Sequence, residues 1–336
     1  MTKSNPIAAQ SCGILFFLSV MTDFILAPPN FSGTAQSVIP AVLCCTVLWS
    51  LLLPILLSAP CSVHADKSLC ALYAAIFIFA ASSALLQAVR FYTAVSDVPL
   101  PQSILFALLL VAALFAASAG WAALGRAAQL VLLLFLLSLL FLFLGNVGEF
   151  RVTNLDFVHH LPQKILADSV TICVFPVEIL LFTMPNTAQD AMKKVVLQKA
   201  VWLTGGALVL LLLCTELRMG TFDAARPTYI LARMGGVSIF KRTDALHVSA
   251  WIFAALMRIA ALLYGATTML SAFLPQKKSR ICFALITLLV VLSACIAASL
   301  PRLWQRNIIS IATVGALLLA LCGRNRRKAS CVNNES

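Results

Sequence analysis

Long runs of apolar residues alternate with short polar segments along the whole chain. A run of about 17 residues or more is long enough to cross the hydrocarbon core of a bilayer as an α-helix. This pattern predicts about ten membrane spans. They lie approximately at residues 8–27, 35–57, 69–89, 104–121, 127–144, 166–184, 195–214, 246–273, 281–300 and 308–322. The expected fold class is therefore an all-α integral membrane protein.

The sixth predicted span contains a proline and a carboxylate within the apolar stretch 171–186. Pro176 has no N–H and its ring clashes with the preceding turn, so the helix is expected to break near Phe175. Glu178 would cost roughly 2 to 3 kcal/mol in hydrocarbon and is expected to face the protein interior or a pathway. A broken helix with an ionisable side chain is typical of a transporter-type binding site. The alternative is a kinked helix with Glu178 directed to the lipid headgroups.

The first predicted span also carries an acid, Asp23, and ends at Pro28 and Pro29. Interrupted spans at corresponding positions in two halves indicate an inverted-repeat architecture. We therefore expect a single transmembrane domain over residues 1–323, with repeats at about 8–145 and 166–322 and a short basic tail at 324–336. The alternative is that Asp23 caps the end of an unbroken first helix.

The eighth predicted span places Trp251, Arg258 and Gly265 at intervals of seven, on one helix face. Alanines beside this stripe would let another backbone approach closely, so the stripe is expected to face protein. Arg258 lies too far from either end of the span to reach water. It needs a buried anionic partner, for which Glu178 and Asp23 are the candidates. Because arginine stays protonated in proteins, our hypothesis is that Arg258 is a fixed counter-ion that carries no transported proton.

Composition and charge support a membrane protein and exclude several other classes. The chain is 61% hydrophobic and 11% charged, with a mean hydropathy of +0.99. The net charge of +12 comes largely from short loops between spans. It therefore predicts topology, with both termini cytoplasmic, and no nucleic-acid partner. The eleven cysteines show no spacing for a disulfide framework or a zinc site. No catalytic arrangement or cofactor motif is apparent, so we expect neither an enzyme nor a bound cofactor or metal.

The long loop before the eighth span has a short element of its own. Pro227 suits the first turn of a helix, and Gly235 and Gly236 suit its end. We expect a helix of one to two turns through Tyr229 on the outer face of the bundle.

Two blocks of sequence carry a resemblance to a known family. The stretch RPTYILARMGGVSIFKRTDALHVSAWIFAALMRIAALLYGATTM resembles the corresponding part of the endospore germination permeases, the B subunits of spore germinant receptors. The segment FPVEILLF is similar to the proline-and-glutamate motif in helix six of that family. The family residues matched here are Pro176, Glu178, Pro227, Trp251 and Arg258. The chain departs from the family pattern at Arg258, where lysine is usual, at Lys241, where an acid is usual, and at residues 21–24, which lack a glycine.

The resemblance implies a LeuT-type fold of the amino acid, polyamine and organocation transporter superfamily. In that fold ten helices form two inverted sets of five, and helices one and six are discontinuous. It also implies a receptor subunit in the spore inner membrane that senses a small germinant, commonly an amino acid, beside A and C subunits.

Unwound segments in helices one and six would present helix N-termini and carbonyls to a zwitterion. We therefore expect the ligand between Thr22, Asp23 and Phe24 on one side and Phe175, Pro176 and Glu178 on the other, with Phe175 covering its apolar part. The alternative function is a proton- or cation-coupled amino-acid transporter. Flux would separate the two functions, because only a transporter accumulates substrate on its own.

Overall fold

A computed structural model describes most of the chain, and the residues it describes are almost entirely helical. The described residues are 6–26, 35–56, 67–96, 100–155, 163, 169, 176–183, 190–220, 227–236, 244–273 and 279–333. The α-helices are α1 (Pro6–Leu26), α2 (Ala35–Leu56), α3 (Lys67–Val95), α4 (Gln102–Ser118), α5 (Trp121–Asn146), α7 (Ile179–Phe182), α8 (Asp190–Met219), α9 (Pro227–Met234), α10 (Asp244–Leu270), α11 (Ser279–Ser299) and α12 (Arg302–Asn333). Two short 3-10 helices follow α5, at Val147–Glu149 and Val152–Asn154.

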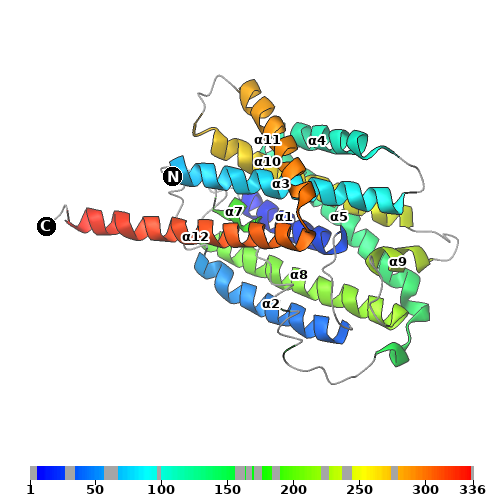
Figure 1. The fold of residues 1–336 in the computed structure, drawn as a ribbon. Coiled ribbons are helices and arrows are strands. Elements are labelled where there is room, and N and C mark those ends of the chain that lie inside the picture. The colour runs from blue at the N-terminus through cyan, green and yellow to red at the C-terminus, as the bar shows by residue number, and fades with distance from the viewer. Residues whose placement is uncertain are drawn as a thin grey trace.

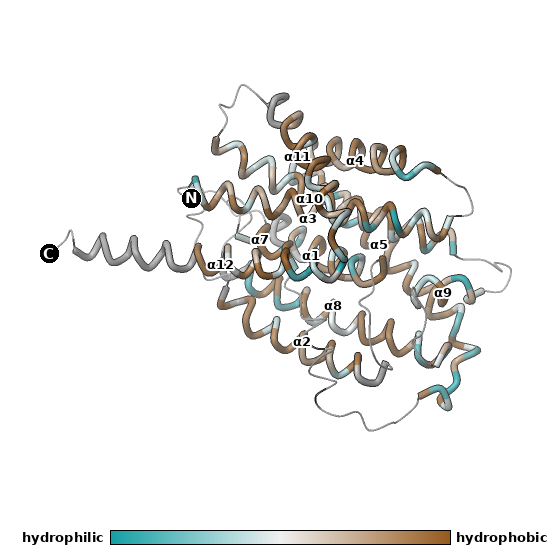
Figure 2. The backbone as a smooth tube through the Cα atoms, viewed as in Figure 1, coloured by the Kyte–Doolittle hydropathy of each residue, from teal (hydrophilic) through white to brown (hydrophobic). Residues whose placement is uncertain are grey.

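Helix length and composition confirm the character of a membrane protein. Within the described residues, four helices are long and apolar enough to cross a bilayer, at Lys67–Val95, Trp121–Glu149, Lys194–Met219 and Asp244–Leu270. Shorter apolar helices occur at Gln10–Leu26, Val38–Leu53, Gln102–Ser118 and Phe283–Ser299. The backbone is hydrophobic along most of the bundle, and polar stretches gather around α9 and beyond the end of α5 (Figure 2). The arrangement as two inverted sets of five helices stays a prediction.

The helix α10 is the centre of the bundle. It packs most extensively against α3 and α5, and it also contacts α1, α4, α9 and α11. Around this centre, α1 and α2 pack against α8, while α11 and α12 pack against α3. The helices α2, α3, α8 and α12 run roughly along a common direction, α11 crosses them steeply, and α12 projects beyond the bundle toward the C-terminus (Figure 1). It continues through the basic segment that the sequence suggested was a separate tail.

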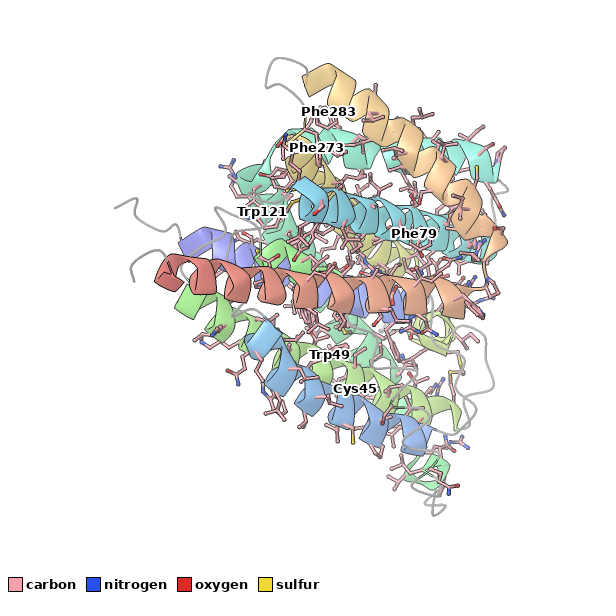
Figure 3. The ribbon with its side chains drawn as sticks, turned by 60° about the vertical axis from the view of Figure 1, so that its left-hand side comes forward. Cys45, Trp49, Phe79, Trp121, Phe273 and Phe283 are labelled. Atoms are coloured by element: carbon pink, nitrogen blue, oxygen red, sulfur yellow. The ribbon has the colours of Figure 1, made fainter. Side chains whose placement is uncertain are left out.

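The predicted inward stripe of α10 is confirmed. The Trp251 side chain is 0% exposed, and a Cβ atom added at Gly265 would lie 2.9 Å from the ring of Phe77 on α3. Side chains of neighbouring helices fill the space between them (Figure 3). The absence of a side chain at Gly265 therefore lets the aromatic ring of α3 lie directly on the α10 backbone.

The prediction of an unwound segment at Thr22–Phe24 is wrong. The helix α1 runs without interruption from Pro6 to Leu26, and the hydroxyl of Thr22 donates to the carbonyl of Leu18 within it. The segment contains no glycine or interior proline, so nothing in it removes a backbone hydrogen bond. The expected break in the sixth span falls near Phe175, which lies outside the described residues. Pro176 is followed by a turn at Val177 and Glu178 and then by the one-turn helix α7.

The short helix in the long loop is confirmed as α9, and it covers one end of the bundle. The hydroxyl of Tyr229 donates to the carbonyl of Val95 at the end of α3, at 3.2 Å. The amide of Asn146, at the end of α5, donates to the carbonyl of Leu231, also at 3.2 Å. These two bonds attach α9 to α3 and α5.

A matched pair of glycines on α8 tests the packing of α2 on α8. A Cβ atom at Gly205 would lie 2.3 to 3.0 Å from the side chain of Thr46 on α2, whereas one at Gly206 would meet nothing within 4 Å. We expect Gly205→Ala to lower the free energy of unfolding by about 1–3 kcal/mol, because the two helices must separate. Gly206→Ala, the control, should stay within about 0.5 kcal/mol of the wild type. Thermal unfolding of the purified variants in detergent measures both, and equal losses would contradict the packing described.

Candidate functional site

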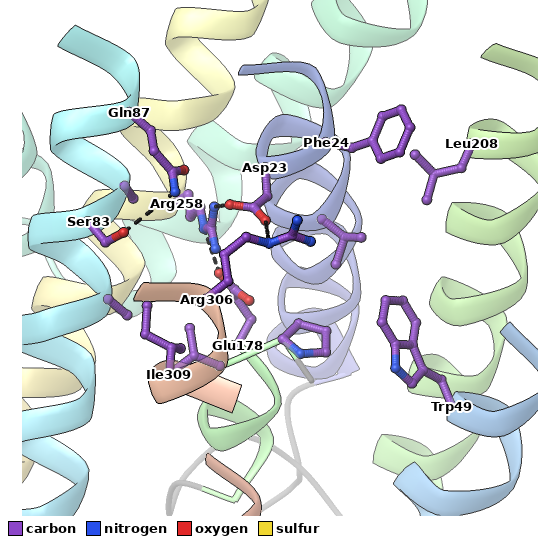
Figure 4. Close-up of a pocket in the computed structure, with 15 residues that line it drawn as sticks. Asp23, Phe24, Trp49, Ser83, Gln87, Glu178, Leu208, Arg258, Arg306 and Ile309 are labelled. Atoms are coloured by element: carbon purple, nitrogen blue, oxygen red, sulfur yellow. Dashed lines mark hydrogen bonds and ion pairs between the residues drawn. The ribbon is translucent and has the colours of Figure 1, made fainter. Parts of the chain in front are cut away.

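A cavity of about 60 Å³ lies at the middle of the bundle, where six helices and the segment 176–178 meet (Figure 4). One part of its wall is apolar, and the other carries four charged side chains and two polar ones. The lining residues are Val20, Asp23, Phe24, Trp49, Ala80, Ser83, Ala84, Gln87, Pro176, Val177, Glu178, Leu208, Arg258, Arg306 and Ile309. A small, partly enclosed cavity that contains a few placed polar groups is typical of a binding site for a small molecule.

Arg258 joins the two acids that the sequence identified. Its Nε lies 2.7 Å from Oε1 of Glu178, and its Nη1 lies 2.8 Å from Oδ1 of Asp23. The Glu178 side chain is 1% exposed. The expected buried partner of Arg258 is therefore present, and both candidate acids fill that role. The planar guanidinium presents donors in two directions, so one side chain from α10 holds α1 and the segment before α7 together.

A second arginine balances the charge of the cluster. Nε of Arg306 on α12 lies 3.6 Å from Oδ2 of Asp23. This separation is longer than a direct hydrogen bond. Together the two carboxylates and the two guanidiniums are electrically neutral. Buried charges require such pairing, because an unpaired ion in a low-dielectric interior is costly.

Three polar atoms around the cavity lack a hydrogen-bond partner among the residues that the structure describes. They are Oε2 of Glu178, Nε1 of Trp49 and Nε of Arg306. Burying a polar group without a partner costs free energy, so most such groups in folded proteins are satisfied. Their gathering around one cavity indicates that this site is built to contact a polar molecule. No metal-binding group of three or more His, Cys, Asp or Glu side chains occurs in the described part of the chain.

A family model described as spore germination protein matches residues 67–300. The match covers α3 to α11 and includes both Glu178 and Arg258. The chain belongs to the spore germination protein family. A search of curated proteins gives no match to this chain.

A hydrogen-bonded polar chain anchors α12 of this spore germination protein beside the cavity. The hydroxyl of Ser83 on α3 donates to Oε1 of Gln305 at 2.8 Å. The Nε2 of Gln305 donates to the carbonyls of Ala297 and Leu300 at the end of α11. Gln305 is fully buried. These bonds fix the turn between α11 and α12, and they thereby position the next residue, Arg306, in the cavity wall.

The structure brings most of the predicted ligand-binding residues of the germination protein together. Asp23, Phe24, Pro176 and Glu178 all line the cavity. Thr22 does not line it, since its hydroxyl bonds back to its own helix. Phe175 lies outside the described residues. Of the predicted structural residues, Pro227 begins α9, while Trp251 and Gly265 pack within the bundle on α10 and do not line the cavity.

Trp49 and Arg306 are among the lining side chains that the sequence did not identify as part of the site. Trp49 lies in a continuous apolar run, which gave no signal that its indole faces a polar cavity. The last predicted span, at residues 308–322, leaves Arg306 outside it, but α12 already begins at Arg302 and includes Arg306. The neighbouring Gln305 is the residue that could have indicated an earlier start of the last helix. Its side chain caps the carbonyls at the end of α11.

Proposed function

We propose that this spore germination protein is the germinant-binding B subunit of a spore germinant receptor. It binds a small amino acid in the central cavity and signals, without catalysis, to A and C partner subunits. Its place is the spore inner membrane, with both chain termini on the cytoplasmic side. The observation that supports this proposal best is the central cavity, where a neutral cluster of four charges meets polar atoms that have no partner among the described residues.

The size of the cavity suits a small amino acid. A cavity of about 60 Å³ has room for roughly four to six water molecules. That space corresponds to a ligand such as glycine or alanine. The apolar wall, which includes Val20, Phe24 and Leu208, suits a small aliphatic side chain. The unpartnered carboxylate oxygen of Glu178 suits an ammonium group.

The ion pairs favour sensing over proton-coupled transport. Arg258 holds both Asp23 and Glu178 within hydrogen-bond distance. Arginine does not release its proton in a protein, so these acids keep a permanent positive partner. A carrier that moves protons through this position needs a group that can alternate between charged and neutral forms, such as lysine. In the proposed receptor, ligand instead shifts the bundle between states that the partner subunits recognise.

Variants at the apolar wall test where the germinant binds. Spores carrying Phe24→Leu should change their order of preference among glycine, alanine and valine, while the protein level stays unchanged. Phe175→Leu tests the sequence prediction that Phe175 covers the apolar part of the same ligand, and the same result is expected. The reason is that each substitution alters the shape of the space for the ligand's side chain. Phe253→Leu is the matched control, because Phe253 lies on α10 with its side chain 49% exposed. The germination rate with each amino acid measures the preference.

Two results would contradict the proposal. One is that spores carrying Phe24→Leu and spores carrying Phe175→Leu both keep the wild-type order of preference among the amino acids. The other is accumulation of amino acid by the purified protein in liposomes under a pH gradient. Such uptake would favour the proton-coupled transporter, the alternative function.

A further inference from the structure

We infer that Trp49 of α2 determines ligand specificity, because its indole N–H donates to the carboxylate of a net-neutral zwitterionic ligand. In the same pose Oε2 of Glu178 accepts from the ligand's ammonium group. This inference rests on the proposed function and defines the chemistry of that cavity. It adds a residue on α2, which neither the sequence motifs nor the ion cluster include.

The burial of Trp49 is the first observation. Its side chain is 5% exposed and lines the cavity, and Nε1 has no acceptor among the residues that the structure describes. The ring of Phe16 on α1 meets the indole edge-on, with centroids 6.4 Å apart at an angle of 81°. That contact holds the indole in place on its apolar side. A buried indole N–H usually has a hydrogen-bond partner, so the cavity is the place where an acceptor would be expected.

Polar side chains near Trp49 on the same helix differ from it in this respect. The thiol of Cys45 donates to the carbonyl of Ser169, and the hydroxyls of Thr46 and Ser50 donate to carbonyls within α2. All three are satisfied by the protein backbone. The indole N–H of Trp49, by contrast, has no acceptor among the described residues, and Trp49 is the side chain of these four that lines the cavity.

The charge balance defines the class of ligand. Asp23 and Glu178 are matched by Arg258 and Arg306, so the cluster is neutral before a ligand binds. A ligand with a net charge would leave one charge unbalanced in a largely enclosed space, at a high cost. A zwitterion adds one positive and one negative group and keeps the balance. Its two ends match the unpartnered acceptor on Glu178 and the unpartnered donor on Trp49.

The bound ligand would then connect two sides of the bundle. In Figure 4, Trp49 and Leu208 lie on one side of the cavity, across from Ser83 and Gln87, with the ion cluster between these two walls. A zwitterion between Trp49 and Glu178 would link α2 to the cluster that joins α1, α10 and α12. Occupancy of the cavity would thereby change how strongly α2 is held to the rest of the site.

Calorimetric titration of the full-length protein in lipid nanodiscs with L-alanine tests the inference. Trp49→Phe keeps the ring and removes the N–H. We expect it to raise Kd roughly 10- to 100-fold, the effect of losing one hydrogen bond to a charged group. Trp121→Phe is the matched control, because it also removes a buried indole N–H that has no described partner, but outside the cavity. Its Kd should stay within about twofold of the wild type, as for a change that does not touch the ligand.

Two further measurements separate a hydrogen bond from a packing effect. Ethylamine, which is alanine without its carboxylate, should bind weakly to the wild type and no more weakly to Trp49→Phe. In protein labelled with ¹⁵N at the indoles, the Trp49 signal should move on addition of L-alanine and not of ethylamine. That signal is assigned by elimination with single Trp→Phe variants at the other positions. The response of the Trp49 signal to L-alanine also tests the inference if the Trp49→Phe variant does not fold.

Failure of the inference can be distinguished from failure of the proposed function. Unchanged L-alanine affinity in Trp49→Phe, equal losses in both tryptophan variants, or a Trp49 indole signal that does not respond to saturating L-alanine would each overturn the inference while leaving the proposed function intact. If the wild type binds neither glycine nor L-alanine, the proposed function fails, and the inference fails with it.

Discussion

Arg258→Ala is expected to lower the free energy of unfolding by about 3–5 kcal/mol, the usual cost of leaving a buried ion without its partner. Arg258 makes hydrogen bonds of 2.7 Å to Glu178 and 2.8 Å to Asp23. Without it, the only cation that remains near Asp23 among the described residues is Arg306, at 3.6 Å. Glu178, 1% exposed, has no other ion pair in the described part of the chain. The loss should appear as a lower unfolding temperature and a smaller monodisperse fraction in detergent.

Three further variants make this prediction specific to the ion cluster. Arg258→Lys should be milder than Arg258→Ala but still destabilising, because one ammonium cannot reproduce the two-directional contact of a guanidinium. Adding Glu178→Gln to Arg258→Ala should recover part of the lost stability. The double variant has no carboxylate at position 178, so no charge is left buried there without a partner. Arg233→Ala, on the exposed surface of α9, should change stability by less than about 0.5 kcal/mol. Wild-type stability in Arg258→Ala would show that the ion pairs do not hold the bundle together.

Trp251→Ala should destabilise the protein by about 3–5 kcal/mol, as expected when a large buried aromatic side chain is removed from a core. Trp251 is 0% exposed. Its ring stacks on His247, with centroids 5.8 Å apart, and meets the ring of Phe91 at 6.0 Å. Phe91 in turn meets Tyr229 of α9 at 6.2 Å. The loss of Trp251 therefore opens a cavity where α3, α9 and α10 meet, and unfolding in detergent again measures it.

A conservative variant and an exposed tryptophan serve as controls for Trp251. Trp251→Phe should cost much less than Trp251→Ala, because the ring is largely kept and the indole N–H has no hydrogen-bond partner among the described residues. Trp202→Ala changes the same residue type on α8, where the side chain is 50% exposed, and should have little effect. Similar losses for Trp251→Ala and Trp202→Ala would contradict the central packing of α10.

The sequence predicted the parts of the fold that depend on local chemistry. The apolar runs predicted the helical membrane architecture, because hydrocarbon requires a backbone whose hydrogen bonds are satisfied within each segment. Pro227 and the glycine pair after α9 predicted its position. The spacing of Trp251, Arg258 and Gly265 predicted a buried face. The cost of a charge in that face predicted an acidic partner for Arg258. Each of these inferences needs only the properties of one segment and its solvent.

The site itself was decided by tertiary structure. The sequence offered Asp23 and Glu178 as alternative partners of Arg258, and only the placement of α1 and of the segment before α7 beside Arg258 shows that it contacts both. It predicted an unwound segment in α1 to match the break expected near Phe175, but residues 22–24 contain no proline or glycine that would interrupt the hydrogen bonds of the helix. The cavity contributions of Trp49 and Arg306 depend on how α2 and α12 pack around the centre. Contacts between helices far apart in sequence leave no local periodicity, so side chains that meet across them can be identified only once the fold has placed them.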